Sequence, residues 1–416
     1  MAESGRLDDG AAVAPAASDA AELLLRFARA AHGAGYPTAD LEERIVALAG
    51  AVGLEGAEVS AQPTLIELSL GKLPHQRTYA LRVRPTTVDL DAVARLDDLV
   101  GEVVAGRLEL HGALEALEEI RARPLERSWP LLLAAYAIAG AALTPVLGGG
   151  WREAVAGALV GLVVGGVAVP AKRRAGTEPM VAPVAAVAAS FCAAALVELG
   201  FDIAPDVVTL AALVTFLPGM TLTIGMRELA TEHLQSGVAN MASALIQLLG
   251  LVFGVGIGRS VAASWFGPTP DVMPETGFSE LHLLAAVAAG LAFTLTLRAR
   301  FRSAPLMCSA TVLALSANAL AAVIVGEEAA VFCAALTIGV AGGHVGTRLR
   351  RSPLVFIVPG VLMLVPGSAG FNSALQLLSN QTVSGITAAF DTFVTAMSIA
   401  YGLMVSTLIL PRRAAS

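Results

Sequence analysis

The chain has 416 residues, of which 56% are apolar and 15% charged. A soluble globular chain is usually about 45–50% apolar and about 25% charged, so the composition excludes a single soluble domain and also a disordered chain. Residues 1–128 hold 13 Lys/Arg and 21 Asp/Glu, whereas residues 129–416 hold 14 and 13. These counts predict an acidic soluble domain, net −8, followed by a large integral-membrane domain, net +1.

The first part of the chain predicts a flexible tail over residues 1–18 and a small cytoplasmic α+β domain over residues 19–127. No apolar signal-peptide core precedes the first charged helix, so we expect this domain to stay in the cytoplasm. The expected elements are two helices within 19–50, separated by the turn 33–37 with Thr38 as N-cap, β-rich runs at 59–70 and 79–83, a helix from Asp89 towards 101–106, and a helix over 111–121.

The soluble domain has no strong enzymatic motif. It contains no Gly-x-Ser-x-Gly elbow, no phosphate-binding glycine loop and no His-Glu-x-x-His pair. Acidic residues such as Asp40 and Glu43 more often decorate a solvated helix face than serve a site. We therefore expect no enzyme and no catalytic residue, with a membrane-anchored hydrolase as the alternative. The polar residues of this domain that could converge are His32, Thr38, Asp40, Glu43 and His75.

The cysteines and the basic residues give no indication of a metal, a cofactor or a nucleic acid. Cys192, Cys308 and Cys333 lie in apolar runs without metal-ligand spacing. No basic run before residue 128 suits nucleic acid. We predict none of these three partners.

The rest of the chain predicts a polytopic α-helical membrane protein. A helix needs roughly 20 apolar residues to cross a bilayer, and the runs are continuously apolar rather than alternating as in barrel strands. Five spans fall within 128–264 and five within 281–410, joined by an external loop over 265–280 and followed by a cytoplasmic tail over 411–416. The ten expected spans are 129–147, 151–170, 180–200, 206–226, 236–264, 281–297, 305–325, 329–347, 353–370 and 383–410.

The charges between the spans predict the orientation. With ten spans, most Lys and Arg fall on one side and most Asp and Glu on the other, which by the positive-inside rule puts both termini in the cytoplasm. The basic side has Arg121, Arg123, Arg127, Lys172, Arg173, Arg174, Arg298, Arg300, Arg302, Arg348, Arg350, Arg351, Arg412 and Arg413. The acidic side has Glu153, Asp202, Asp271, Glu275, Glu280, Glu327 and Glu328.

An internal repeat relates the two groups of spans at an offset of 148 residues. Pro218-Gly219 matches Pro366-Gly367, Ser236-Gly237 matches Ser384-Gly385, and Gly254 matches Gly402. A unit of five spans is odd, so the second copy must enter the membrane inverted. Inverted repeats with interrupted helices are typical of secondary transporters, whose sites lie near the midplane where the repeats meet.

Two polar stripes coincide under this repeat, which predicts that they face each other across one cavity. Adding 148 to Ser243 gives Asp391, and adding 148 to Gln247 gives Thr395. Asn240, Ser243 and Gln247 share one helix face, as do Ser384, Thr387, Asp391 and Thr395.

Asp391 is the acidic residue expected deepest inside a span. A charge there costs about 2.5–3.5 kcal/mol even on the lenient insertion scale, which favours a functional role such as proton carriage. A structural Asp bonded to a neighbouring helix is the alternative. Arg227, Glu228 and His233 follow the fourth span and are expected to be solvated or interfacial.

The two Pro-Gly pairs, Pro218-Gly219 and Pro366-Gly367, predict interrupted helices. An interruption exposes N–H groups that can bind a carboxylate and C=O groups that can bind an ammonium. Simple kinks are the alternative, because Pro and Gly are common in membrane helices.

Several segments resemble the threonine/serine exporter family, in the right order from about Ala20 to Leu410. In the soluble part these are Gly33-Ala-Gly-Tyr-Pro-Thr-Ala-Asp-Leu-Glu-Glu-Arg-Ile, Val88-Asp-Leu and Ala116-Leu-Glu-Glu-Ile. In the membrane part, Phe216-Leu-Pro-Gly-Met and Leu364-Val-Pro-Gly-Ser are similar to the family's two membrane modules.

The resemblance implies a multi-pass exporter of threonine and serine in the bacterial inner membrane, driven by the proton motive force. Its partners would be these amino acids, protons and the lipid bilayer, and homo-oligomerisation is left open. Asp391 would be the proton-linked group, the broken helices would hold the zwitterion, and Asn240, Ser243 and Gln247 would offer hydrogen bonds. Transport of another small solute, a dipeptide or a dicarboxylate, remains the alternative, although a dicarboxylate would need buried basic partners.

Overall fold

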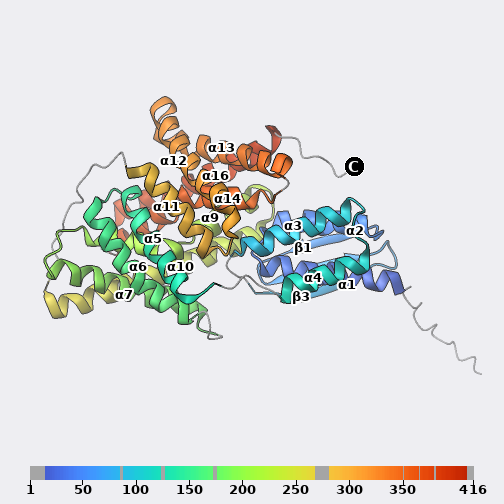
Figure 1. Cartoon of the computed structure of the whole chain (residues 1–416), viewed down its shortest axis with the longest axis horizontal. Coiled ribbons are helices and arrows are strands. Elements are labelled where there is room, and N and C mark those ends of the chain that lie inside the picture. Colours follow the sequence, from blue (N-terminus) through green and yellow to red (C-terminus); the bar gives the residue numbers. More distant parts are fainter. Residues whose placement is uncertain are drawn as a thin grey trace, which may run out of the picture. The chain divides into compact units, whose positions relative to one another are not determined.

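A computed structural model describes residues 15–84, 88–122, 127–171, 176–267, 281–349, 351–364, 366–378 and 381–409 (Figure 1). The chain divides into two compact units. Of the described residues, 15–84 and 95–122 belong to the N-terminal unit, and 88–94 together with those from 127 to 409 belong to the membrane unit. The predicted cytoplasmic tail over 411–416 lies outside the described residues, as does most of the predicted external loop.

The N-terminal unit combines helices with one antiparallel sheet of order β1-β2-β3. Strand β2 pairs with both neighbours, so that Glu67 lies opposite Ser60 on one side and Ala80 on the other. The alternation of β2 buries Ile66, Leu68 and Leu70, as a half-buried strand requires. The elements are α1 (Pro15–Gly33), α2 (Thr38–Ala51), β1 (Glu58–Ala61), β2 (Leu65–Leu70), β3 (Arg77–Arg82), α3 (Leu90–Val104) and α4 (Leu110–Ala122).

Two local details differ from the sequence-based expectation. Helix α1 begins at Pro15, inside the predicted tail. Helix α2 has Pro37 rather than Thr38 at its N-cap, and Thr38 is already helical and buried. The ψ angle of 143° at Pro37 holds the cap residue extended, because proline is compatible with that geometry just before a helix.

The start of α3 belongs to the membrane unit, although the sequence assigned it to the soluble domain. Asp89 caps the helix by accepting the Ala92 N–H at 3.0 Å. Within the membrane unit, Arg298 pairs with Asp89 at 3.3 Å and Arg300 pairs with Asp91 at 2.5 Å. The Leu90 N–H also donates to the Leu297 carbonyl at 2.9 Å, so two ion pairs and one backbone bond fix this segment.

The membrane unit is entirely helical in its described part. Among the described residues, eight helical segments are long and apolar enough to cross a membrane, one of which, Leu354–Leu377, contains both α14 and α15. The bent pair of α8 and α9 would be a ninth. A shorter apolar helix covers His282–Thr296, so the chain is a multi-pass membrane protein. The helices are α5 (Trp129–Val146), α6 (Trp151–Ala171), α7 (Glu178–Glu198), α8 (Pro205–Leu213), α9 (Gly219–Ala230), α10 (Leu234–Phe266), α11 (Leu281–Thr296), α12 (Ala304–Val325), α13 (Glu327–Leu349), α14 (Leu354–Met363), α15 (Pro366–Leu378) and α16 (Thr382–Ile409).

The helix contacts of the membrane unit recur at the offset of 148 residues. A Cβ atom on Gly237 of α10 would lie 2.7 Å from Cγ and 2.9 Å from the amide nitrogen of Leu229. A Cβ atom on Gly385 of α16 would lie at the same 2.7 and 2.9 Å from Leu377. The hairpins α9–α10 and α15–α16 are therefore packed alike, each through a glycine that permits close approach.

Two further helix contacts each join a glycine to a serine. Gly258 of α10 packs on Ser190 of α7, where an added Cβ atom would collide with the Ser190 hydroxyl oxygen. Gly339 of α13 likewise packs on Ser406 of α16, where an added Cβ atom would collide with the Ser406 hydroxyl oxygen. Either arrangement keeps the two helices close, because one small residue faces another.

Candidate functional site: the meeting of two interrupted helices

The chain is interrupted between α8 and α9, at the first Pro-Gly pair. A short 3-10 turn (Val214–Phe216) ends the first helix, and α9 begins at Gly219 after a bend of 58°. Pro218 has no N–H, and its ψ angle of 38° lies outside the helical region. The interruption therefore leaves backbone groups that need partners from elsewhere.

Gln247 of α10 supplies one such partner. Its Nε2 donates to the carbonyl oxygen of Phe216 at 2.7 Å. This side-chain amide replaces an intrahelical donor that the interruption removes. The structure thus brings Gln247 to the break that contains Pro218 and Gly219.

The second Pro-Gly pair lies directly against the first. Helix α14 ends at Met363, and α15 begins at Pro366, whose side chain lies outside the described residues. A Cβ atom on Gly367 would lie 2.8 Å from Cβ of Leu217 and 3.1 Å from the amide nitrogen of Gly219. Only a residue without a side chain permits this approach, so the two interruptions meet in one place.

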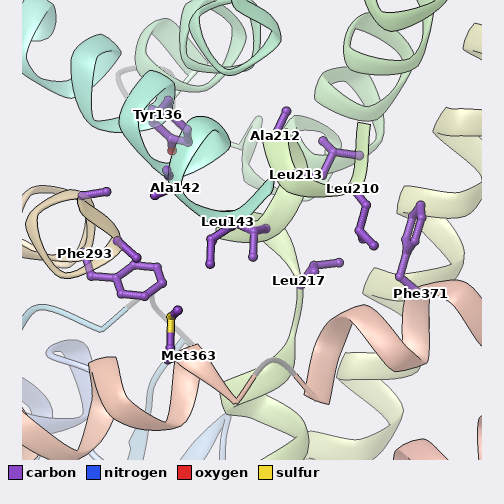
Figure 2. Close-up of a cluster of buried hydrophobic side chains, with 14 of the residues drawn as sticks. Tyr136, Ala142, Leu143, Leu210, Ala212, Leu213, Leu217, Phe293, Met363 and Phe371 are labelled. Atoms are coloured by element: carbon purple, nitrogen blue, oxygen red, sulfur yellow. The ribbon is translucent and has the colours of Figure 1, made fainter. Parts of the chain in front are cut away.

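Apolar side chains surround this meeting point (Figure 2). Leu143 of α5, Leu213 of α8 and Leu217 are buried in one cluster with Met363. Figure 2 shows Met363 just before the second interruption and Phe371 beyond it on α15. Polar groups here act in a low dielectric, which strengthens their electrostatic interactions.

The interruption can bind an anion through the N-terminus of α9. The first backbone hydrogen bond of α9 is donated by the Leu222 N–H to the Pro218 carbonyl oxygen at 2.9 Å. The N–H groups from Gly219 to Thr221 therefore lie at the positive end of the helix, before the hydrogen-bond ladder begins. Such a terminus is suited to a carboxylate.

Glu228 is the functional candidate that the sequence reasoning missed. It was expected in a solvated link, but it lies in α9 with 2% of its surface exposed. Its Oε2 accepts a hydrogen bond from Nδ2 of Asn240 at 2.6 Å, so Asn240 is engaged by α9. The signal that could have revealed its burial is the offset of 148, which relates Glu228 to the uncharged Gln376 within α15.

The remaining predicted site residues lie on the outer flanks of α10 and α16. Ser243 and Asp391 are exposed at equivalent positions. Thr387 is also exposed, and its hydroxyl donates to the Val383 carbonyl at 3.0 Å. Thr395 is half-buried. On α10 the structure thus engages both ends of the stripe, Asn240 and Gln247, and leaves Ser243 between them exposed. On α16 only Thr395 of the stripe is half-buried.

The buried acid of α6, unlike Glu228, has donors on both oxygens. Glu153 accepts the Gly150 N–H at 2.9 Å and the Ala204 N–H at 3.2 Å. These bonds tie the start of α6 to the segment before α8. Glu153 is therefore a structural cap rather than a site residue.

The N-terminal unit contains a basic cavity of about 830 Å³. Burial lowers the pKa of His32, against the raising effect of the Gln62 and Pro63 carbonyls. His75, one of the residues that could have converged with His32, lies exposed in the turn between β2 and β3. The cavity is lined by Arg29, His32, Gly33, Thr64, Arg82, Val83 and Arg84.

A buried polar cluster joins α2 to α3 in the same unit. Burial, and then the Asp97 carboxylate, raise the pKa of Tyr36 far above its ordinary value. Arg44 Nε lies 3.0 Å from Asp97 Oδ1, and Asp40 adds its charge to the pair. Burial opposes the charge of Arg44, but the attraction to Asp97 leaves its pKa raised. Among the described residues of the chain, no group of three His, Cys, Asp or Glu side chains could hold a metal ion.

Comparison with known proteins assigns the chain to a family. The family model ThrE, for threonine/serine exporters, matches residues 22–262, and the model ThrE_2 ("Threonine/Serine exporter, ThrE") matches residues 281–409. A "Threonine/serine exporter" of Corynebacterium glutamicum is 22% identical over 92% of this chain and 76% of its own length. A protein named "Probable threonine/serine exporter" in Mycobacterium tuberculosis is 28% identical over 92% of this chain and 75% of its own.

Similarity also extends to a yeast protein. The "Pheromone-regulated membrane protein 10" of Saccharomyces cerevisiae is 26% identical over 90% of this chain and 50% of its own length. No solved structure matches. Because the two family models cover both the soluble and the membrane part, the chain belongs to the threonine/serine exporter family.

Proposed function

We propose that this protein exports threonine and serine from the bacterial cytoplasm, driven by the proton motive force through alternating access. The observation that carries the proposal is the contact of Gly367 with Gly219, which joins two interrupted helices from distant parts of the chain. Secondary transporters bind small solutes where such helices meet. The names of the two bacterial relatives support the substrate.

The interrupted helices would hold the zwitterion. The N-terminal amides of α9 suit its carboxylate, and backbone carbonyls freed by the interruption suit its ammonium. Gln247 and Asn240 are engaged by Phe216 and Glu228, so we assign them to positioning α9 as well as to hydrogen bonding. Ser243, Thr387 and Thr395 would complete the polar lining, and Asp391 would be the proton-linked group.

We further propose ten spans in two inverted copies of five, with both termini in the cytoplasm. The recurring glycine contacts of α9–α10 and α15–α16 support two copies, and the basic residues on one predicted side support the orientation. In a background without Cys192, Cys308 and Cys333, Phe201→Cys should react with an impermeant thiol reagent from outside. Leu349→Cys should react only from inside, and the opposite pattern would overturn the orientation.

The substrate is tested by radiolabelled threonine counterflow in proteoliposomes, with and without a pH gradient. We expect counterflow that unlabelled serine competes away, and net efflux that an inward proton gradient accelerates. Absence of counterflow for both amino acids would remove the substrate assignment and leave the membrane fold standing. Counterflow without any effect of the gradient would remove proton coupling alone.

A further inference from the structure

The buried carboxyl of Glu228 has one oxygen that the fold leaves free. Asn240 binds Oε2 at 2.6 Å. Oε1 is buried and has no hydrogen-bond partner within the part of the chain that the structure describes. A buried polar oxygen without a partner is unfavourable, and a charged one more so. A hydrogen bond, a cation or a proton at Oε1 would remove this cost.

The other copy of the repeat carries the neutral isostere at the same position. The offset of 148 relates Glu228 to Gln376 of α15, and their neighbours Leu229 and Leu377 make the same close contact with a glycine of the next helix. Oε1 of Gln376 is likewise buried and without a partner among the described residues. The corresponding position of α15 thus holds an uncharged amide of the same shape as the carboxyl of Glu228.

The length of α9 decides between a substrate ammonium and a proton. Nine residues separate Gly219 at the interruption from Glu228, which in an α-helix corresponds to about 13 Å. A zwitterion whose carboxylate lies at the start of α9 cannot extend its ammonium over that distance. The free oxygen is therefore suited to a proton.

We propose that Glu228 takes up and releases a proton at Oε1, as a second proton-linked group besides the one proposed at Asp391. A proton from water on one side forms an O–H bond at Oε1, and the same bond breaks when the proton leaves to the other side. The interruption and Glu228 share α9, and Gln247 and Asn240 of α10 hold both. A proton at Glu228 can thus change the position of the substrate-binding end through one rigid helix.

Few other charges lie on the elements packed against α9. Its own sequence has Arg227, and the turn that follows has Glu232 and His233. Helix α10 carries Arg259 near its far end, where it pairs with Asp206. Helix α16 carries Asp391 and Tyr401, and α14 and α15 have no ionisable residue. In the described part of the chain, no cation forms an ion pair with Glu228.

The test combines Glu228→Gln with infrared titration of the full-length protein in liposomes. Raising the pH should remove a protonated-carboxyl band in the wild type, and Glu228→Gln should lack that band. Glu153→Gln is the matched control, because it changes a buried carboxyl whose two oxygens both have donors. Identical titration spectra of the wild type and Glu228→Gln would overturn the proposal, whatever the protein transports.

The link to export rests on the proposed function and has its own readout. Glu228→Gln should retain threonine counterflow within about twofold and lose a gradient stimulation of about fivefold or more. If Glu228→Gln retains the gradient stimulation, Glu228 takes no part in coupling. If the wild-type protein itself shows no threonine counterflow, the substrate assignment fails instead. If Glu228→Gln does not fold, Asn240→Leu is the second variant: it removes the donor to Oε2, so the carbonyl band of Glu228 protonated at Oε1 should move to higher frequency. A protonated-carboxyl band of unchanged frequency in Asn240→Leu contradicts the proposal.

Discussion

The side chain of Gln247 donates a hydrogen bond of 2.7 Å to the carbonyl oxygen of Phe216. Phe216 ends the 3-10 turn that leads into the α8–α9 interruption. This one contact fixes α10 to the bend of 58°. It also explains how an interrupted helix is maintained in an apolar surrounding, where water cannot replace a lost donor.

Gln247→Ala should destabilise the protein by about 1–3 kcal/mol, because it leaves the Phe216 carbonyl without its donor. Thermal unfolding in detergent measures the loss, and counterflow should fall with it. Ser260→Ala on the same helix is the control, since the Ser260 hydroxyl is exposed and bonds only within the helix. Equal effects of the two variants would contradict a special role for Gln247.

Gly367→Ala should impair transport and destabilise by about 1–3 kcal/mol, because the new Cβ meets Leu217 and the Gly219 backbone. Gly256→Ala on α10 is the control, as nothing lies within 4 Å of the built Cβ. There the better helix propensity of Ala should leave stability equal or slightly higher. Wild-type counterflow and melting temperature in Gly367→Ala would show that the two interruptions can separate freely.

Asp391→Asn should leave the protein inserted and able to exchange threonine, but should abolish acceleration by an inward proton gradient. The neutral amide keeps the size of the side chain and cannot carry a proton. Thr407→Val on the same helix is the control: the exposed Thr407 hydroxyl bonds only the Met404 carbonyl within α16, so this variant is expected to keep the gradient response. Full coupled efflux by well-folded Asp391→Asn would remove this residue from the proton pathway.

The N-terminal unit should lose stability below about pH 6.5 because of His32. Burial lowers its pKa in the folded state from 6.5, so the unfolded chain binds the proton more tightly. The stabilisation of the folded state by neutral His32 is complete above pH 6.5. It is lost as the pH falls towards the lower pKa that His32 has in the folded state. Hydrogen-exchange protection of β2, corrected for intrinsic rates, measures it. His32→Gln should flatten this dependence, whereas exposed His75→Gln should leave it unchanged.

The sequence by itself determined which segments are helical and apolar, that an acidic α+β region precedes them, and that Pro218-Gly219 and Pro366-Gly367 interrupt their helices. These features depend on local composition, periodicity and the chemistry of proline, all of which are properties of neighbouring residues in the sequence. The offset of 148 was visible for the same reason. The ten-span inverted layout and the role of Asp391 remain predictions.

Only the tertiary structure decided what these segments touch. The burial of Glu228, the bond from Gln247 to Phe216 and the contact of Gly367 with Gly219 all join residues from different helices. A charge next to a predicted link looks solvated in sequence, because hydropathy averages over a window and carries no information on the neighbouring helix. The close packing of α9 against α10 removed Glu228 from solvent, and that packing exists only in the folded chain.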